Sequence, residues 1–233
     1  SGSGANTYAG LTTVSGGTLN LNKTAGTDAI AGNLTVSGGT AVLQAANQIK
    51  DTANVVVSGG TLGLGGNSDT VAGVQMTSGG ITGSGGTLTG TTAYDMQGGT
   101  VSAILGGTVG LNKTGAGTVT LSGANTYTGA TNITAGTLSL GVNDALNSAS
   151  AVTVNGATAV LNTSTFTDTV ASVLLQGGGT INGSGALTST AAFDLQSGTV
   201  NGVLAGAAGA NKTTGGTVAL NASNTYTGAT TVS

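Results

Sequence analysis

The chain has 233 residues, of which 45 are glycine, and it contains no proline, cysteine, histidine or tryptophan. Only 5% of its residues are charged, and four lysines against seven aspartates give a net charge of −3. This composition excludes collagen, disulfide frameworks, thiol and zinc–histidine chemistry, and the basic surface that binds nucleic acid. We therefore expect no cofactor, metal or nucleic-acid partner. No apolar run reaches the roughly 18 residues of a membrane span.

A repeat of about twenty residues runs along the chain, and its marker is a glycine followed by a threonine. Ten intervals separate the first marker from the last, and Ile81 fills the one position without threonine. A period of this length is typical of solenoid proteins, whose repeats stack on one another. The marker residues are Thr18, Thr40, Thr61, Thr100, Thr118, Thr137, Thr158, Thr180, Thr199 and Thr217.

Two short strands are predicted in each repeat, because apolar residues alternate with small or polar ones on both sides of the marker. In chain order, the inward pairs before the markers are Leu34 and Val36, Val55 and Val57, Tyr94 and Met96, Val152 and Val154, and Phe193 and Leu195. The inward pairs after the markers are Leu19 and Leu21, Leu62 and Leu64, Val119 and Leu121, Leu138 and Leu140, and Val218 and Leu220.

One repeat carries too little apolar surface to fold alone, so the repeats must stack. The sequence therefore predicts an all-β, right-handed parallel β-helix of about 11–12 coils, forming one domain over residues 1–233. A longer period lies above the short one, since Asp69-Thr70-Val71 is repeated as Asp168-Thr169-Val170, 99 residues later. We interpret this offset as a duplicated block of about 99 residues, approximately 24–131 and 132–231.

The segment Lys113 to Gly141, KTGAGTVTLSGANTYTGATNITAGTLSLG, resembles the autotransporter passenger-associated strand repeat. Partial copies occur at Ser3 to Leu21 and at Asn211 to Ser233. The resemblance implies a β-helical stalk at the surface of a Gram-negative bacterium, with roles in adhesion, autoaggregation or biofilm formation. Export and anchoring are expected of a larger parent protein.

Three Asn-Thr-Tyr motifs fall in the longer loop between two strands. Asparagine can bond its own backbone there, and tyrosine can cover apolar edges. One interpretation is structural loop closure. The other makes Tyr8, Tyr127 and Tyr226 surface contacts for a glycan or a neighbouring cell.

The marker threonines are expected to form one regular row on an outer face, one coil apart. We assign Thr18, Thr40, Thr61, Thr118 and Thr137 as candidate surface contacts on this row. Flat threonine rows suit ice-binding solenoids, although threonine also favours exposed strand positions for purely structural reasons.

The seven aspartates are the only groups with catalytic potential. The matched pairs Asp69 and Asp168, and Asp95 and Asp194, are each separated by roughly 24 Å at about 4.8 Å per coil, too far for a two-carboxylate site. We interpret them as duplicated surface or turn residues, with Asp95 and Asp194 facing solvent, and we expect no enzyme. Recurring lysines in one sequence context, Lys23, Lys113 and Lys212, indicate a repeated structural role.

These observations favour a structural or adhesive segment of an extracellular bacterial surface protein, with a glycan or cell-surface partner. The first and last residues fall within coils, which indicates either a slice of a longer passenger or self-association. The first alternative is a fibre that assembles by head-to-tail stacking, with face-to-face association also open. The second alternative is an ice-binding solenoid, and a polysaccharide-degrading enzyme comes last.

Overall fold

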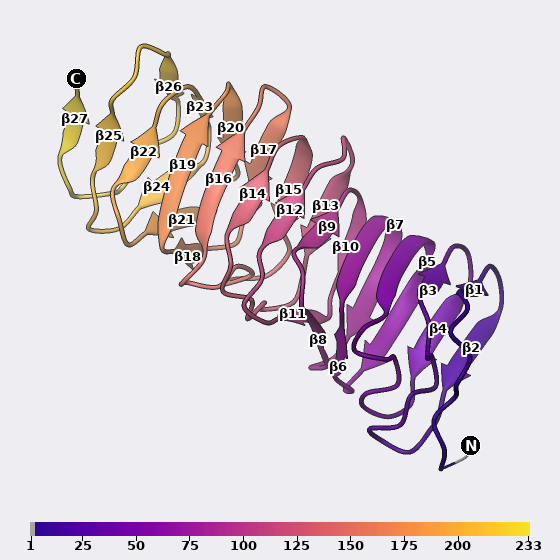
Figure 1. Cartoon of the computed structure of the whole chain (residues 1–233). Coiled ribbons are helices and arrows are strands. Elements are labelled where there is room, and N and C mark those ends of the chain that lie inside the picture. The colour runs from indigo at the N-terminus through magenta and orange to yellow at the C-terminus, as the bar shows by residue number, and fades with distance from the viewer. Residues whose placement is uncertain (1–2) are drawn as a thin grey trace.

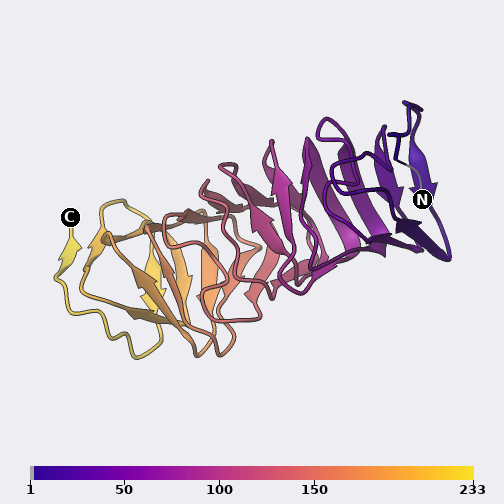
Figure 2. The same cartoon turned by 90° about the horizontal axis from the view of Figure 1, so that it is seen from below.

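The chain folds as a rod of stacked coils with its two ends far apart (Figures 1 and 2). This computed structural model describes residues 3–233 and is a parallel β-solenoid of about eleven coils of roughly 20 residues, so the predicted fold class is confirmed. The described residues contain 27 strands and no helix. Within them, accordingly, no helix could span a membrane.

Each coil passes through up to three strands in turn, which lie on three sides of the rod that we call faces 1, 2 and 3. All strand pairs are parallel, and each strand pairs with its equivalents in the coils before and after. The strands of face 1 are β1 (Thr12–Val14), β3 (Leu34–Val36), the first part of β5 (Asn54–Gly65), the first part of β7 (Gly73–Gly83), β9 (Tyr94–Met96), β12 (Leu111–Lys113), β14 (Thr131–Ile133), β16 (Ala151–Asn155), β19 (Ser172–Gln176), β22 (Phe193–Leu195), β25 (Ala210–Lys212) and β27 (Thr230–Val232).

Face 2 follows face 1 directly along the chain. Its strands are β2 (Thr18–Leu21), β4 (Thr40–Leu43), the second parts of β5 and β7, β10 (Gly99–Val101), β13 (Thr118–Leu121), β15 (Gly136–Leu140), β17 (Ala159–Asn162), β20 (Gly179–Asn182), β23 (Gly198–Val200) and β26 (Val218–Leu220).

Face 3 is interrupted, because only some coils place a strand there. Its strands form two separate groups of three: β6 (Asp69–Val71), β8 (Thr87–Gly90) and β11 (Ile104–Gly106), then β18 (Asp168–Val170), β21 (Ala186–Ser189) and β24 (Val203–Ala205). Loops occupy this side in the remaining coils, and the three Asn-Thr-Tyr motifs lie in such loops.

The core is a narrow column of aliphatic side chains inside the coils. The predicted inward pairs are confirmed through the body of the rod: Leu34, Val57, Met96 and Val154 are each fully buried. Burial stops at the last strand of face 2, where Leu220 is 42% exposed because no coil covers it.

Glycine is required at the corner between faces 1 and 2, where successive coils approach closely. Gly79 has a φ of 89°, and a Cβ there would lie 2.2 Å from the carbonyl oxygen of Gly60 in the coil before. A Cβ on Gly99, with a φ of 116°, would likewise lie 2.4 Å from the oxygen of Gly79. A side chain would therefore force the coils apart, and these positions explain part of the high glycine content.

Val154→Asp is expected to lower the free energy of unfolding by more than about 3 kcal/mol, because it places an unpaired charge in the apolar column. Thr153→Asp, on the outer side of the same strand, is the matched control and should cost less than about 1 kcal/mol. Thermal and urea unfolding followed by circular dichroism measure both variants. A melting temperature for Val154→Asp within a degree or two of the parent would contradict the inward column.

Candidate functional site

The Asn-Thr-Tyr loop at residues 125–127 joins three successive coils through its asparagine. Asn125 is 4% exposed, and its Oδ1 accepts a hydrogen bond from the Leu105 N–H of the previous coil at 2.8 Å. Its Nδ2 donates to the Ala145 carbonyl of the next coil at 2.7 Å and to the Gly123 carbonyl at 3.1 Å. The amide side chain thus adds to the hydrogen bonds that the loop backbone makes with the same coils, from Thr126 N to the Leu105 carbonyl at 2.9 Å and from Asn125 N to the Ala145 carbonyl at 3.2 Å.

The tyrosine of this loop closes the core. The Tyr127 hydroxyl lies 2.8 Å from Thr131 Oγ1, and its ring packs against Tyr94 with centroids 6.1 Å apart. Burial raises the pKa of Tyr127 far above its ordinary value, so the hydroxyl stays protonated. The assignment of Tyr127 as a surface contact is therefore wrong: the side chain has no exposed area, because coils cover it on both sides.

The equivalent tyrosines at the two ends of the rod are accessible. Tyr8 is 43% exposed and its hydroxyl accepts from Thr12 Oγ1 at 3.2 Å, while Tyr226 is half-buried and pairs with Thr230 Oγ1 at 2.9 Å. Each therefore keeps the internal bond of the buried loop, but lacks one covering coil. Their role as contacts for a glycan or cell remains a prediction.

The threonine row begins on face 2 as predicted. Thr18 pairs with Thr40, and Thr40 with Thr61. The next two positions in the row are Gly80 and Thr100, so the threonine array is already broken by a glycine.

Beyond Thr100, the row no longer passes through the marker threonines. Thr100 pairs with Thr120 rather than with the next marker, Thr118. Thr118 pairs with Thr137, and Thr137 with Val160, in a neighbouring row two residues away. The prediction that Thr118 and Thr137 continue the same row is therefore wrong. The spacing between markers varies along the chain, whereas hydrogen bonding between strands fixes which residues lie side by side. The flat array that an ice-binding surface requires is absent along this face of residues 3–233.

Lys113 is a buried structural cation, as the repeated sequence context indicates. Its Nζ donates to the Gly115 carbonyl in its own coil and to the Ala135 carbonyl in the next coil, the latter at 2.8 Å. Burial lowers the pKa of Lys113, an effect that the negative charge of Asp95 partly offsets. The ammonium group thus fastens one coil to the next.

Asp69 and Asp168 were expected at the surface or in turns, and this is wrong: each is only 1% exposed and begins a strand of face 3. Asp69 Oδ2 accepts from the N–H groups of Gln48 and Ile49 at 2.8 and 3.0 Å, and Asp168 Oδ2 accepts from Leu146 N at 2.9 Å. Among the described residues, the Oδ1 atom of each has no hydrogen-bond partner. They bind the backbone of the previous coil as Asn125 does, but lack its amide donor.

This environment favours the neutral carboxyl group. Burial raises the pKa of Asp69 to about 6, although the backbone N–H groups of Gln48 and Ile49 oppose the shift. Burial also raises the pKa of Asp168 to about 7, against the opposing N–H of Leu146.

Asp95 has the opposite environment on the outer side of face 1. Gln75 and Gln97 donate to its Oδ2 at 2.8 and 2.9 Å, and Thr114 donates to its Oδ1 at 2.8 Å. Partial burial by itself raises the pKa of Asp95, but these three hydrogen bonds outweigh it and hold the pKa below its ordinary value. The matched Asp194 lies five coils away along the same row and has Leu174 where Asp95 has Gln75. Within residues 3–233, Gln196 alone donates a side-chain hydrogen bond to it, at 3.0 Å.

The acidic groups are therefore dispersed. Residues 3–233 hold no group of three or more acidic side chains that could bind a metal ion. The distance between Asp95 and Asp194 across five coils, roughly 24 Å, exceeds that of any two-carboxylate hydrolase.

These coils define a class of protein: a parallel β-solenoid whose coils are tied together by a recurring Asn-Thr-Tyr loop, the architecture of a passenger-like structural segment. The family model described as the passenger-associated-transport-repeat matches residues 3–21, 111–140 and 208–233, about a third of the chain. The match confirms the resemblance, and its three regions contain all three Asn-Thr-Tyr loops. No curated protein and no solved structure matches the chain.

Asn125→Ala is expected to lower the free energy of unfolding by about 2–4 kcal/mol, because it leaves the buried N–H of Leu105 unpaired and removes the amide donor to the Ala145 and Gly123 carbonyls. Asn132→Ala removes a partly exposed amide of face 1 and is the matched control, with an expected loss below about 1 kcal/mol. Urea unfolding compares the two. Equal, small losses of unfolding free energy in both variants would contradict the role of Asn125 in bonding neighbouring coils.

Because Asp69 and Asp168 are buried, we expect the free energy of unfolding to fall as the pH rises from about 4 to 7. Their folded pKa values of about 6 and about 7 lie above the unfolded value of 3.8, so the folded chain binds more protons in this window. Their contribution is complete below the unfolded pKa and is lost as the pH rises through the folded values. At about 1.4 kcal/mol per pKa unit, the loss is on the order of 3–4 kcal/mol for each.

Urea unfolding at a series of pH values tests this. The free energy of unfolding of the double variant Asp69→Asn, Asp168→Asn should depend little on pH in this window, because an amide does not ionise. Asp95→Asn is the control and should keep the parental slope, since the pKa of Asp95 lies below the window. A parental stability that is flat or rises between pH 4 and 7 would refute the assignment.

Proposed function

We propose that this chain is a structural and adhesive segment of an exported bacterial surface protein. The passenger-associated repeat supports a secreted or cell-surface location. The rod geometry suits a stalk that holds a contact surface away from the cell. Function then lies in the outer faces of the solenoid rather than in a pocket.

The observation that supports an adhesive function is a row of hydrogen-bonded amide side chains on the outer side of face 2. Asn201 Nδ2 donates to Asn182 Oδ1 at 2.9 Å, and Asn221 Nδ2 donates to Asn201 Oδ1 at 2.8 Å. In the same row, Asn162 Nδ2 lies 3.4 Å from Ser139 Oγ. These bonds fix uncharged donors and acceptors one coil apart, which suits many weak hydrogen bonds to an uncharged polymer such as a polysaccharide.

Adhesion of beads that carry the chain to polysaccharide-coated glass tests the proposal. The double variant Asn182→Lys, Asn201→Lys breaks the amide row and should reduce attachment several-fold. Asn132→Lys with Thr153→Lys makes the same charge change on face 1 and should leave attachment near the parental value. Equal attachment of all three would contradict a contact on face 2, and parental binding no greater than that of bare beads would contradict adhesion itself.

A further inference from the structure

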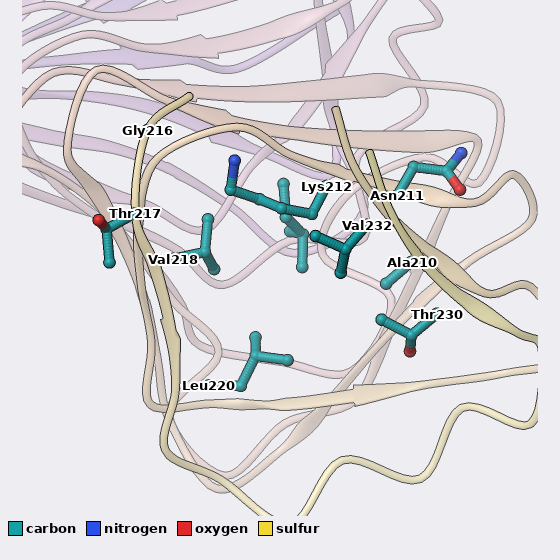
Figure 3. A pocket seen from close by; sticks show the side chains of 10 residues that line it. Ala210, Asn211, Lys212, Gly216, Thr217, Val218, Leu220, Thr230 and Val232 are labelled. Carbon is teal, nitrogen blue, oxygen red and sulfur yellow. The ribbon is translucent and has the colours of Figure 1, made fainter. Parts of the chain in front are cut away.

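A hollow of about 190 Å³ lies beside β25, β26 and β27, and its lining is mostly aliphatic. Val218, Leu220 and Val232 point into it, and Lys212 is the one charged side chain among its lining residues (Figure 3). Because Val218 and Leu220 continue the inward column of the core, we assign the hollow no ligand. A feature of different chemistry lies on the outer side of face 2, among its asparagines.

Three asparagines of the chain are followed directly by glycine: Asn155, Asn182 and Asn201. In such a pair, the backbone nitrogen of the glycine can attack the side-chain carbonyl carbon, Cγ, of the asparagine, because glycine has no Cβ to crowd the approach. The two reacting groups belong to one short segment, so the attack is intramolecular. The hydrogen bonding of each glycine nitrogen then decides which pair reacts.

The glycine nitrogen is bonded in two of the three pairs. Gly156 N donates to the Gln176 carbonyl at 3.3 Å, and Gly202 N donates to the Ile181 carbonyl at 3.0 Å. Each bond must break before its nitrogen can lose a proton and attack. Within residues 3–233, the N–H of Gly183 has no such partner. Gly183 directly follows β20 and is half-buried, so water reaches it.

The side chain of Asn182 is also prepared for the attack. Asn201 Nδ2 donates to Asn182 Oδ1 at 2.9 Å. Negative charge collects on this oxygen when the Gly183 nitrogen bonds to Cγ, and a donor already directed at the oxygen stabilises that charge. Asn221 Nδ2 in turn donates to Asn201 Oδ1 at 2.8 Å, which holds the Asn201 amide in place.

The first block of the duplication has an equivalent segment without either asparagine. Thr82 stands where the second block has Asn182, in the sequence ITGSGG against INGSGA, and Ser102 stands where it has Asn201. The N–H of Gly83, the glycine after Thr82, donates to Ser102 Oγ at 3.3 Å. The coil therefore forms without the two amides, and its first copy also holds the glycine nitrogen.

We propose that Asn182 deamidates in the folded rod, faster than Asn155 and Asn201. Hydroxide from the solvent removes the proton of the Gly183 nitrogen, and the bond from this nitrogen to Cγ of Asn182 forms. The bond from Cγ to Nδ2 then breaks, and ammonia leaves. Water opens the resulting cyclic imide at either of its carbonyl groups, which gives an aspartate or an isoaspartate. No electrons are exchanged with another reactant.

Deamidation alters the amide row of face 2. A carboxylate at this position still accepts from Asn201 Nδ2 but donates to nothing, and an isoaspartate also adds a methylene group to the backbone at the end of β20. The row gains a negative charge beside Asn162 in the previous coil and Asn201 in the next. The modification stands on the contacts described above, whereas its effect on attachment to a polysaccharide rests on the proposed function.

Peptide mapping by mass spectrometry tests the modification, because replacing an amide by a carboxyl group changes the mass of the peptide. In the folded chain at mildly alkaline pH, conversion at Asn182 should be at least several-fold faster than at Asn155 and Asn201. In urea, where no glycine nitrogen is held, the three sites should convert at similar rates. Equal rates at the three sites of the folded chain, or the slowest at Asn182, would overturn the proposal.

Asn201→Ser introduces the residue that the first block has at the equivalent position. It removes the donor to Asn182 Oδ1 and supplies a hydroxyl for the Gly183 nitrogen, so conversion at Asn182 should fall several-fold. Asn155→Ser makes the same change in another Asn-Gly pair and should leave conversion at Asn182 at the parental rate. A parental rate in Asn201→Ser would contradict activation by Asn201.

The bead assay measures the consequence for attachment. Attachment of the parent chain to polysaccharide-coated glass should fall as Asn182 converts, whereas Asn182→Thr, which cannot deamidate, should keep its initial attachment over the same incubation. Conversion of Asn182 without loss of attachment would overturn the effect on adhesion and leave the modification itself intact. Attachment that is lost equally in Asn182→Thr would also contradict the link to this residue.

Discussion

Every coil of this protein depends on hydrogen bonds to the coils beside it. A parallel strand leaves half of its backbone groups for the coil before and half for the coil after, and a coil of twenty residues buries too little apolar surface to fold alone. Where a face 3 strand meets a loop of the neighbouring coil, side chains add to these bonds: Asn125, Asp69 and Asp168 accept hydrogen bonds from the backbone of the previous coil. At the end of a face 1 strand, Lys113 donates to the next coil. The buried polar groups thus supplement the backbone ladders between coils.

The fold could be predicted from the sequence because it depends on two local patterns. Alternation along the strands identified inward residues such as Val57 and Val154, and the twenty-residue period required the strands to stack. The recurrence of Lys113 and of the Asn-Thr-Tyr loops also indicated a structural role before their contacts were known.

What the sequence could not provide was the register between coils and the interior of face 3. Thr118 follows a marker glycine like Thr100, yet Thr100 pairs with Thr120, because the two markers are 18 residues apart whereas the ladder joins residues 20 apart. Tyr127 and Asp168 looked like surface residues, because their burial is produced by coils roughly twenty residues away in the sequence. Asp95 and Asp194 share a motif but differ in environment, since Gln75 and Leu174 in the preceding coil decide which carboxylate is fully bonded.

Because all the strands run in the same direction, the rod has a polarity like that of a cytoskeletal filament. The coils on each face therefore follow one another in a fixed direction from β1 to β27, and turning the rod end for end does not superimpose its outer side chains on themselves. A long ligand lying along a face would meet two different surfaces in its two orientations.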